Sequence, residues 1–166
     1  MDIKVLSSGH LLWNKKTYTC ALGKSGVTNE KKEGDNATPL GCFALREVLY
    51  RLDMIKEVPI TTLPTCAIQE NDGWCDDPND IKYNKKISLP YAARHETLWK
   101  DDGIYDIIVL LGYNDDLIIS GKGSAIFLHV ARPNYTPTEG CVALALPDLL
   151  EILSGVSKET RVCIER

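Results

Sequence analysis

The sequence lacks several features that would assign it to special protein classes. Its longest apolar run, IIVLLGY from Ile107, is far shorter than the roughly 18 residues that a membrane span needs. No low-complexity tract or internal repeat indicates disorder or a solenoid. The net charge is −4 and the basic residues are dispersed, so the charge pattern of a nucleic-acid-binding protein is missing. We therefore expect a globular protein with no membrane span and no nucleic-acid partner.

The six cysteines lack the spacing of a metal site. No Cys-x-x-Cys pair occurs, and no nearby histidine completes a zinc ligand set around Cys66 and Cys75. These two cysteines are close enough in sequence for a disulfide, and the sequence leaves that pairing open. Cys20, Cys42 and Cys163 lie in apolar, strand-like segments, so we expect them to be buried free thiols.

Length and hydrophobic pattern predict one compact domain over residues 1–166. Alternating short runs separated by turn residues predict a meander of strands between Ile3 and Leu22. Nearly continuous apolar segments starting at Tyr105 and Ser124 predict central strands covered on both faces. Between Asp53 and Lys100 only TCAIQE is typical of a strand, which predicts a large irregular excursion. LALPDLLEILSGV predicts one short helix and TRVCIE a last strand, giving a mainly β fold.

A long polar, glycine-rich segment between Gly23 and Gly41 is a candidate rim of a binding site, because long unstructured loops are usually functional. Within it, Asp35 and Thr38 are candidate cleft residues, although turn formation explains them equally well. The aromatic residues Tyr113 and Trp74 are candidates to bracket a substrate, with ordinary packing as the alternative.

Candidate chemistry concentrates in HVARPNYTPTEGCVAL, which starts at His129. A histidine that ends an apolar strand is by itself more typical of a satisfied core residue. Cys141 changes this interpretation, because it follows Gly140 at a junction where a sharp turn can direct the thiol and backbone N–H groups into one cleft. Histidine is the usual base for a cysteine nucleophile, and the N–H groups of Gly140 and Cys141 are candidate oxyanion donors. We therefore expect the pKa of Cys141 to be lowered, unlike those of the other five cysteines.

Three segments together resemble one protein family. GSAIFLHVA followed by TEGCVAL resembles the catalytic signature of the YkuD-type L,D-transpeptidases, a histidine followed by Ser/Thr-x-Gly-Cys. KKEGDNATPLGCFAL, from Lys31, resembles that family's acidic-Gly-Asp-x-x-Thr-Pro-x-Gly segment, and GWCDDPNDIKYNK, from Gly73, resembles a stretch found in compact members. The segments stand in the family's order and span almost the whole chain, roughly from Ile3 to Ile164.

The resemblance implies a YkuD-like fold, sandwich-like or barrel-like, with a short helix after the catalytic cysteine. It implies that Cys141 forms a thioester with the diamino acid of a peptidoglycan stem peptide, and that the side-chain amine of a second stem then resolves it to cross-link the cell wall. His129 would act as base and then as acid, with no metal or organic cofactor, and carbapenems would acylate the cysteine. Water as acceptor would instead give an L,D-carboxypeptidase or amidase, and a non-catalytic peptidoglycan-binding module is the alternative from another class.

The sequence also departs from the family's common pattern. The usual Ser-His-Gly-Cys is Thr-Glu-Gly-Cys here, which makes Thr138 and Glu139 substrate-binding candidates. Ala143 stands where Arg or Asn is frequent, so Arg132 of the preceding loop is the candidate to hold a stem carboxylate instead. These departures leave open which stem bond is cleaved and which cross-link forms.

The sequence gives conflicting indications of where the protein is located. The resemblance implies the periplasm or cell envelope, yet no secretory signal is visible at the start of the sequence. Free cysteines would fit a reducing compartment. A cytoplasmic location, an unconventional export route and a signal outside these residues therefore all stay open, as does the oligomeric state.

Overall fold

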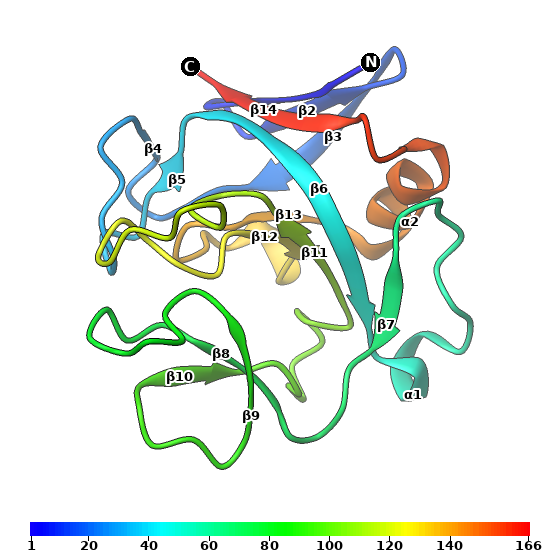
Figure 1. Cartoon of the computed structure of the whole chain (residues 1–166). Coiled ribbons are helices and arrows are strands. Elements are labelled where there is room, and N and C mark those ends of the chain that lie inside the picture. Colours follow the sequence, from blue (N-terminus) through cyan, green and yellow to red (C-terminus); the bar gives the residue numbers. More distant parts are fainter.

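The computed structural model describes every residue from Met1 to Arg166 and is built around a closed sheet. The main sheet consists of β1 (Ile3–Leu6), β2 (His10–Trp13), β3 (Lys16–Ala21), β6 (Gly41–Tyr50), β7 (Thr65–Ala67), β11 (Ile107–Leu111), β12 (Phe127–Val130), β13 (Val142–Leu144) and β14 (Arg161–Glu165). Its strand order is β11-β12-β13-β3-β2-β1-β14-β6-β7, and a further pairing of β6 with β11 closes it into a barrel (Figure 1). The mainly β, barrel-like fold is thus confirmed.

The predicted N-terminal meander is present as β1, β2 and β3, each antiparallel to the next. In β1, Ile3 and Val5 are fully buried while Lys4 is exposed, as expected for a strand with one face on the core. The last strand, β14, pairs in parallel with β1, so the two ends of the chain lie close together (Figure 1).

The central strands are apolar throughout because both of their faces are covered, as predicted. In β11, Ile107 and Val109 belong to the main core of 22 buried residues inside the barrel. Ile108, between them, belongs to a second cluster on the opposite face, together with Phe127 and Cys141. The second cluster places Cys141 at a junction between the barrel wall and the elements outside it.

The longest helix, α2 (Leu146–Gly155, 10 residues), follows β13 as the sequence predicts. Pro147 lies in its first turn, where proline is tolerated, and the buried stripe of Leu149, Ile152 and Leu153 packs on the main core. The other helical segments are short, α1 (Leu52–Ile55) and the 3₁₀ turn η1 (Pro133–Tyr135). None of the helices is long and apolar enough to cross a membrane.

The irregular excursion predicted between Asp53 and Lys100 is wrong in part, because it contains a second sheet. This sheet has the order β10-β8-β9, with β8 (Asp72–Cys75), β9 (Lys86–Ser88) and β10 (His95–Thr97). Figure 1 shows it on the side of the barrel opposite β14. Strands of three or four residues among prolines and charges are too short to show a period-2 pattern, which is why the sequence does not reveal them. The long loop after β3 likewise contains a short pair, β4 (Val27–Thr28) and β5 (Thr38–Pro39).

The expectation of free thiols is wrong for two cysteines. Cys42 in β6 and Cys163 in β14 are opposite each other in the strand register and form a disulfide. Cys66 is exposed and Cys75 is buried, and both are free, so they are not bonded to each other. Cys20 is a buried free thiol, as expected.

Candidate active site

A cavity of about 760 Å³ lies between the end of β12, the loop before β13, the long loop after β3 and the second sheet. Cys141 and His129 both contribute to its wall, as do Thr138, Glu139 and Arg132. These are the five predicted site residues that the structure brings to one place.

Neighbouring parallel strands position the two reactive side chains. β12 and β13 run in parallel, with His129 opposite Ala143. Because side chains alternate along a strand, Cys141 lies on the same side as Ala143, and both residues face the cavity together with His129.

The glycine before the cysteine is required by the backbone. Gly140 has φ +141°, and a Cβ added there would come within 2.8 Å of the carbonyl oxygen of Ala37. Its N–H donates to Oγ1 of Thr138 at 3.1 Å, so the expectation that this N–H points into the cavity as an oxyanion donor is wrong. The Thr138 hydroxyl in turn donates to the Cys141 carbonyl at 2.7 Å, which fixes the turn that presents the thiol.

The thiol of Cys141 is buried and held by backbone groups. Its S–H donates to the carbonyl of Ala125 at 3.1 Å, and Sγ accepts the N–H of Phe127 at 3.4 Å. Burial raises the pKa of Cys141 to about 12, against a smaller lowering by the Phe127 N–H. The expected lowered pKa is therefore wrong, because desolvation outweighs the donors. Burial raises the pKa of Cys20 to about 12 as well, so position on the cavity wall, rather than ionisation, sets Cys141 apart.

His129 is also buried, with 5% of its surface exposed. Its Nδ1 lies 2.9 Å from the carbonyl oxygen of Val130, so Nδ1 carries a hydrogen and Nε2 keeps its lone pair. Desolvation lowers the pKa of His129 to about 4, the Val130 carbonyl raises it, and the charge of Arg132 lowers it further. The ring also packs edge-to-face on Tyr105 at 5.4 Å between centroids. The site thus combines a neutral thiol with a neutral imidazole at pH 7.

The family model of the YkuD domain, described as the L,D-transpeptidase catalytic domain, matches residues 5–164 of the 166 in the chain. The protein belongs to this family. YkuD domains act on peptidoglycan and are typically associated with the cell envelope. No curated protein matches the chain.

In this YkuD domain, two of the predicted cleft residues support the long loop and do not line the cavity. Asp35 accepts hydrogen bonds from two backbone N–H groups of its own turn and pairs with Lys31. Thr38 is fully buried and accepts the N–H of Gly23 at 2.9 Å. The loop that they hold does reach the cavity through Glu33 and its neighbours, which is consistent with its predicted place at the rim.

The two predicted aromatic residues lie outside the cavity of the YkuD domain because they pack against other rings. Tyr113 meets Phe43 edge-on at 5.4 Å between centroids. Trp74 meets Phe127 edge-on at 5.1 Å, and its N–H donates to Oδ1 of Asn84 at 3.0 Å. Both residues are therefore described by ordinary packing, the alternative that the sequence left open.

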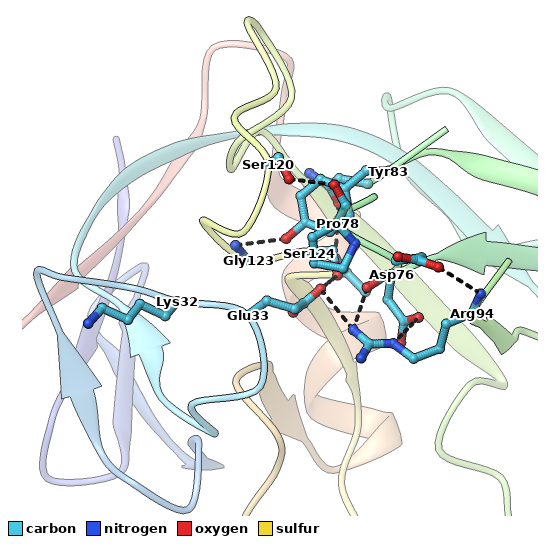
Figure 2. A network of polar contacts seen from close by, with 12 residues as sticks. Lys32, Glu33, Asp76, Pro78, Tyr83, Arg94, Ser120, Gly123 and Ser124 are labelled. Carbon is cyan, nitrogen blue, oxygen red and sulfur yellow. Dashed lines mark hydrogen bonds and ion pairs between the residues drawn. The ribbon is translucent and has the colours of Figure 1, made fainter. Parts of the chain in front are cut away.

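A polar network joins the second sheet to the long loop along one side of the cavity. Figure 2 shows the guanidinium of Arg94 between the carboxylates of Glu33 and Asp76. Nε of Arg94 lies 3.0 Å from Oδ1 of Asp76, and Nη2 lies 3.9 Å from Oε1 of Glu33. Glu33 also accepts the hydroxyl of Ser124, from the segment before β12. Three parts of the chain that are far apart in sequence are thereby tied together around the YkuD site.

Sequence reasoning missed several cavity residues, namely Glu33, Asp76, Arg94, Glu96, Lys100 and Tyr105. Most of them come from the excursion, whose short strands gave no pattern to place them. Tyr105 begins the apolar segment YDIIVLLGYN, and this was the one available signal of a polar tip at a buried strand end. No group of three or more His, Cys, Asp or Glu side chains lies in an arrangement that would hold a metal ion.

Proposed function

We propose that this YkuD domain is a cysteine-dependent L,D-transpeptidase that cross-links peptidoglycan stem peptides through Cys141 and His129. The observation that supports the proposal most strongly is the placement of both side chains on one cavity wall, presented by adjacent parallel strands. Because both groups are neutral in the free protein, the imidazole takes the thiol proton as the substrate reacts.

The first half of the reaction makes a thioester. Nε2 of His129 takes the proton of Cys141, and Sγ forms a bond to the diamino-acid carbonyl of the donor stem. The tetrahedral intermediate then loses the terminal D-amino acid, whose amine takes the proton from His129. In the second half, the side-chain amine of an acceptor stem attacks the thioester and passes a proton to His129, and this proton returns to the leaving sulfur.

The thiol must turn before it reacts. In the free protein the S–H of Cys141 donates to the carbonyl of Ala125, away from the imidazole. Rotation of the side chain exchanges this bond for one to His129, and catalytic hydrogen bonds are often incomplete before substrate binds. The N–H of Cys141 donates to no group in the protein, and we assign it to the developing oxyanion in place of the N–H of Gly140.

We assign recognition of the stem peptide to the loop between β12 and β13. Arg132 lies on the cavity wall and pairs with Asp102 at 2.9 Å, with both side chains more than 40% exposed. Exposed pairs of this kind contribute little, so a substrate carboxylate can replace Asp102. Glu139 is exposed beside the thiol, and Thr138 holds the turn below it.

Purified muropeptides test this function. The protein should form dimers with release of a terminal D-amino acid, and a chelator should have no effect. Cys141→Ala should abolish both products, and His129→Ala should slow them by roughly 10²–10⁴-fold while thermal unfolding shows a folded protein. Cleavage of the glycan strand, or dimers formed by Cys141→Ala, would contradict the proposal.

The same products separate the alternatives. Shortened stems without dimers would indicate water as acceptor and hence an L,D-carboxypeptidase, and binding without any product would indicate a binding module. Mass spectrometry of the dimers would show which stem residue is the acyl donor.

A carbapenem gives an independent test of the nucleophile. We expect one adduct per chain, on Cys141, because this thiol alone shares the cavity with a histidine. The exposed Cys66 is the internal control, since it should react with a simple alkylating reagent and not with the carbapenem. Peptide mapping of the parent protein and of Cys141→Ala measures this, and an adduct on Cys66 or Cys75 would mean that the nucleophile is misassigned.

A further inference from the structure

One of the three lysine and arginine side chains on the cavity wall is unpaired. Arg94 is held by Asp76, and Arg132 is held by Asp102. Lys100 makes no ion pair, and its Nζ lies 5.3 Å from the centroid of the Tyr105 ring. It is therefore the cavity cation that can bind an anionic group of a ligand without first giving up an ion pair within the protein.

Of the four carboxylates on the cavity wall, Glu96 and Glu139 form no ion pair, and of these two only Glu96 is partly withdrawn from water, since Glu139 is exposed. Glu33 and Asp76 share the guanidinium of Arg94 (Figure 2). Glu96 is half-buried and forms no ion pair, although the charge of Lys100 acts on it from a distance, and its single side-chain hydrogen bond comes from the hydroxyl of Tyr105. A carboxylate withdrawn from water without a cation is costly unless a ligand supplies one.

Both groups are positioned by the same ring. The hydroxyl end of Tyr105 holds Glu96, and the face of its ring lies below Lys100. The ring itself is buried and packs edge-on against His129. A negative and a positive group that form no ion pair with each other thus both lie beside one buried residue, next to the reactive pair.

We propose that Glu96 and Lys100 bind a zwitterionic amino-acid centre, with its ammonium group on Glu96 and its carboxylate on Lys100. The proposal rests on the proposed function, because such a centre forms the free end of a diamino-acid side chain in a stem peptide. The donor stem and the acceptor stem both carry one, and the experiment below distinguishes them.

The electrostatics of the site agree with this assignment. Burial raises the pKa of Glu96, the hydrogen bond from Tyr105 and the charge of Lys100 lower it, and the charges of Glu139 and Asp76 raise it; the net shift is upward. A bound ammonium group acts in the opposite direction and stabilises the ionised carboxylate. Binding is therefore expected to release a proton near the pH at which Glu96 titrates in the free protein.

A binding measurement without turnover tests the pair. The probe is a tripeptide ending in diaminopimelic acid, titrated by calorimetry into Cys141→Ala protein. Glu96→Gln, which can keep the bond to Tyr105, and Lys100→Met should each weaken binding by roughly tenfold or more in this background. Glu70→Gln and Lys85→Met are matched controls, because both residues are exposed, unpaired and outside the cavity.

Two modified probes identify which group binds where. Acetylating the side-chain amine should weaken binding to the parent protein and add little to the loss in Glu96→Gln. Amidating the side-chain carboxyl should weaken binding to the parent protein and add little to the loss in Lys100→Met. The proposal would be overturned if Glu96→Gln and Lys100→Met both bound the unmodified probe with unchanged affinity. It would also be overturned if the loss from each probe modification simply added to the loss from its matching substitution.

The active enzyme then shows which stem carries the bound centre. If the donor uses the site, both variants should slow formation of the thioester, followed by mass spectrometry in the absence of acceptor. If the acceptor uses it, thioester formation should be normal and the KM for the acceptor should rise more than kcat falls. Because the calorimetry needs no chemistry, a protein that binds the probe but forms no dimers would disprove the proposed function and leave this inference standing.

Discussion

At the scale of single residues, burial keeps the two reactive groups uncharged. His129 has its pKa lowered to about 4 and Cys141 has its pKa raised to about 12, in both cases chiefly by desolvation. A preformed thiolate–imidazolium pair is therefore absent from the free protein at neutral pH. This arrangement protects the thiol from reagents that need a thiolate and leaves activation to the substrate.

The first prediction concerns pH. Above a pH of about 4, Nε2 of His129 is unprotonated, so kcat/KM for thioester formation should be nearly constant around neutral pH. It should fall as the pH drops through about 4, because protonation removes the base. Stopped assays across pH measure this. A fall centred near the ordinary histidine value of about 6.5 would show that the imidazole is far more hydrated than its contacts indicate.

The same pKa has a consequence for stability, with a definite sign. The folded pKa of about 4 lies below the unfolded value of about 6.5, so the unfolded chain binds more protons between these values. The contribution of His129 to the free energy of unfolding is therefore complete above about pH 6.5 and is lost as the pH falls toward 4. Glu96 acts with the opposite sign, because its folded pKa is raised, so the parent protein must be compared with His129→Asn to isolate the effect.

The second prediction concerns Arg132, the candidate that replaces the cation missing at Ala143. Arg132→Ala should lower kcat/KM by roughly tenfold or more, because a charge-assisted contact to a stem carboxylate is lost. Its exposed pair with Asp102 contributes little to folding, so the melting temperature should hardly change. Asp102→Asn is the matched control, since it removes the same pair but keeps the cation. Unchanged kinetics in Arg132→Ala would make this side chain an ordinary surface residue.

At the scale of elements, the turn before β13 determines where the thiol lies. The third prediction is that Gly140→Ala destabilises the protein by at least about 2 kcal/mol, from an unfavourable positive φ and a backbone contact at 2.8 Å. Activity should fall further than stability, because relief of that contact displaces Cys141. Gly121→Ala is the control, with a positive φ but no atom near the added Cβ. Equal effects of the two substitutions in thermal unfolding and turnover would contradict this account.

The elements also show how far the sequence alone can lead. The meander, the central strands and α2 were predictable because each is long enough to show its pattern in the sequence. The pattern is alternation in β1, a nearly continuous apolar run in β11 and an apolar stripe in α2. The second sheet was not, because its strands are too short to carry a period. The pair of His129 and Cys141 was found from its motif, whereas Glu96 and Lys100 come from β10 and the turn after it and reach the cavity only through the fold.

At the scale of the whole molecule, the barrel depends on pairings between segments far apart in the chain. β6 pairs on one edge with β14 and β7 and on the other with β11. No local sequence pattern predicts such pairings. This is why the disulfide between the paired strands β6 and β14, here called the β6–β14 seam, could not be predicted from the spacing of the cysteines. Cys42 and Cys163 are 121 residues apart in sequence and adjacent only because the barrel closes.

The fourth prediction follows from this closure. A covalent link over so long a loop restricts the unfolded chain, so replacing both cysteines by alanine should lower the free energy of unfolding by about 2–5 kcal/mol. A reductant should destabilise the parent protein to a similar degree and leave the double variant unchanged, and Cys66→Ala should behave like the parent. Turnover at 25 °C should persist in the double variant, because neither cysteine lines the cavity. If denaturant unfolding of the parent does not respond to reductant, the seam is held by strand pairing and packing alone, and the disulfide has no part in the stability of the barrel.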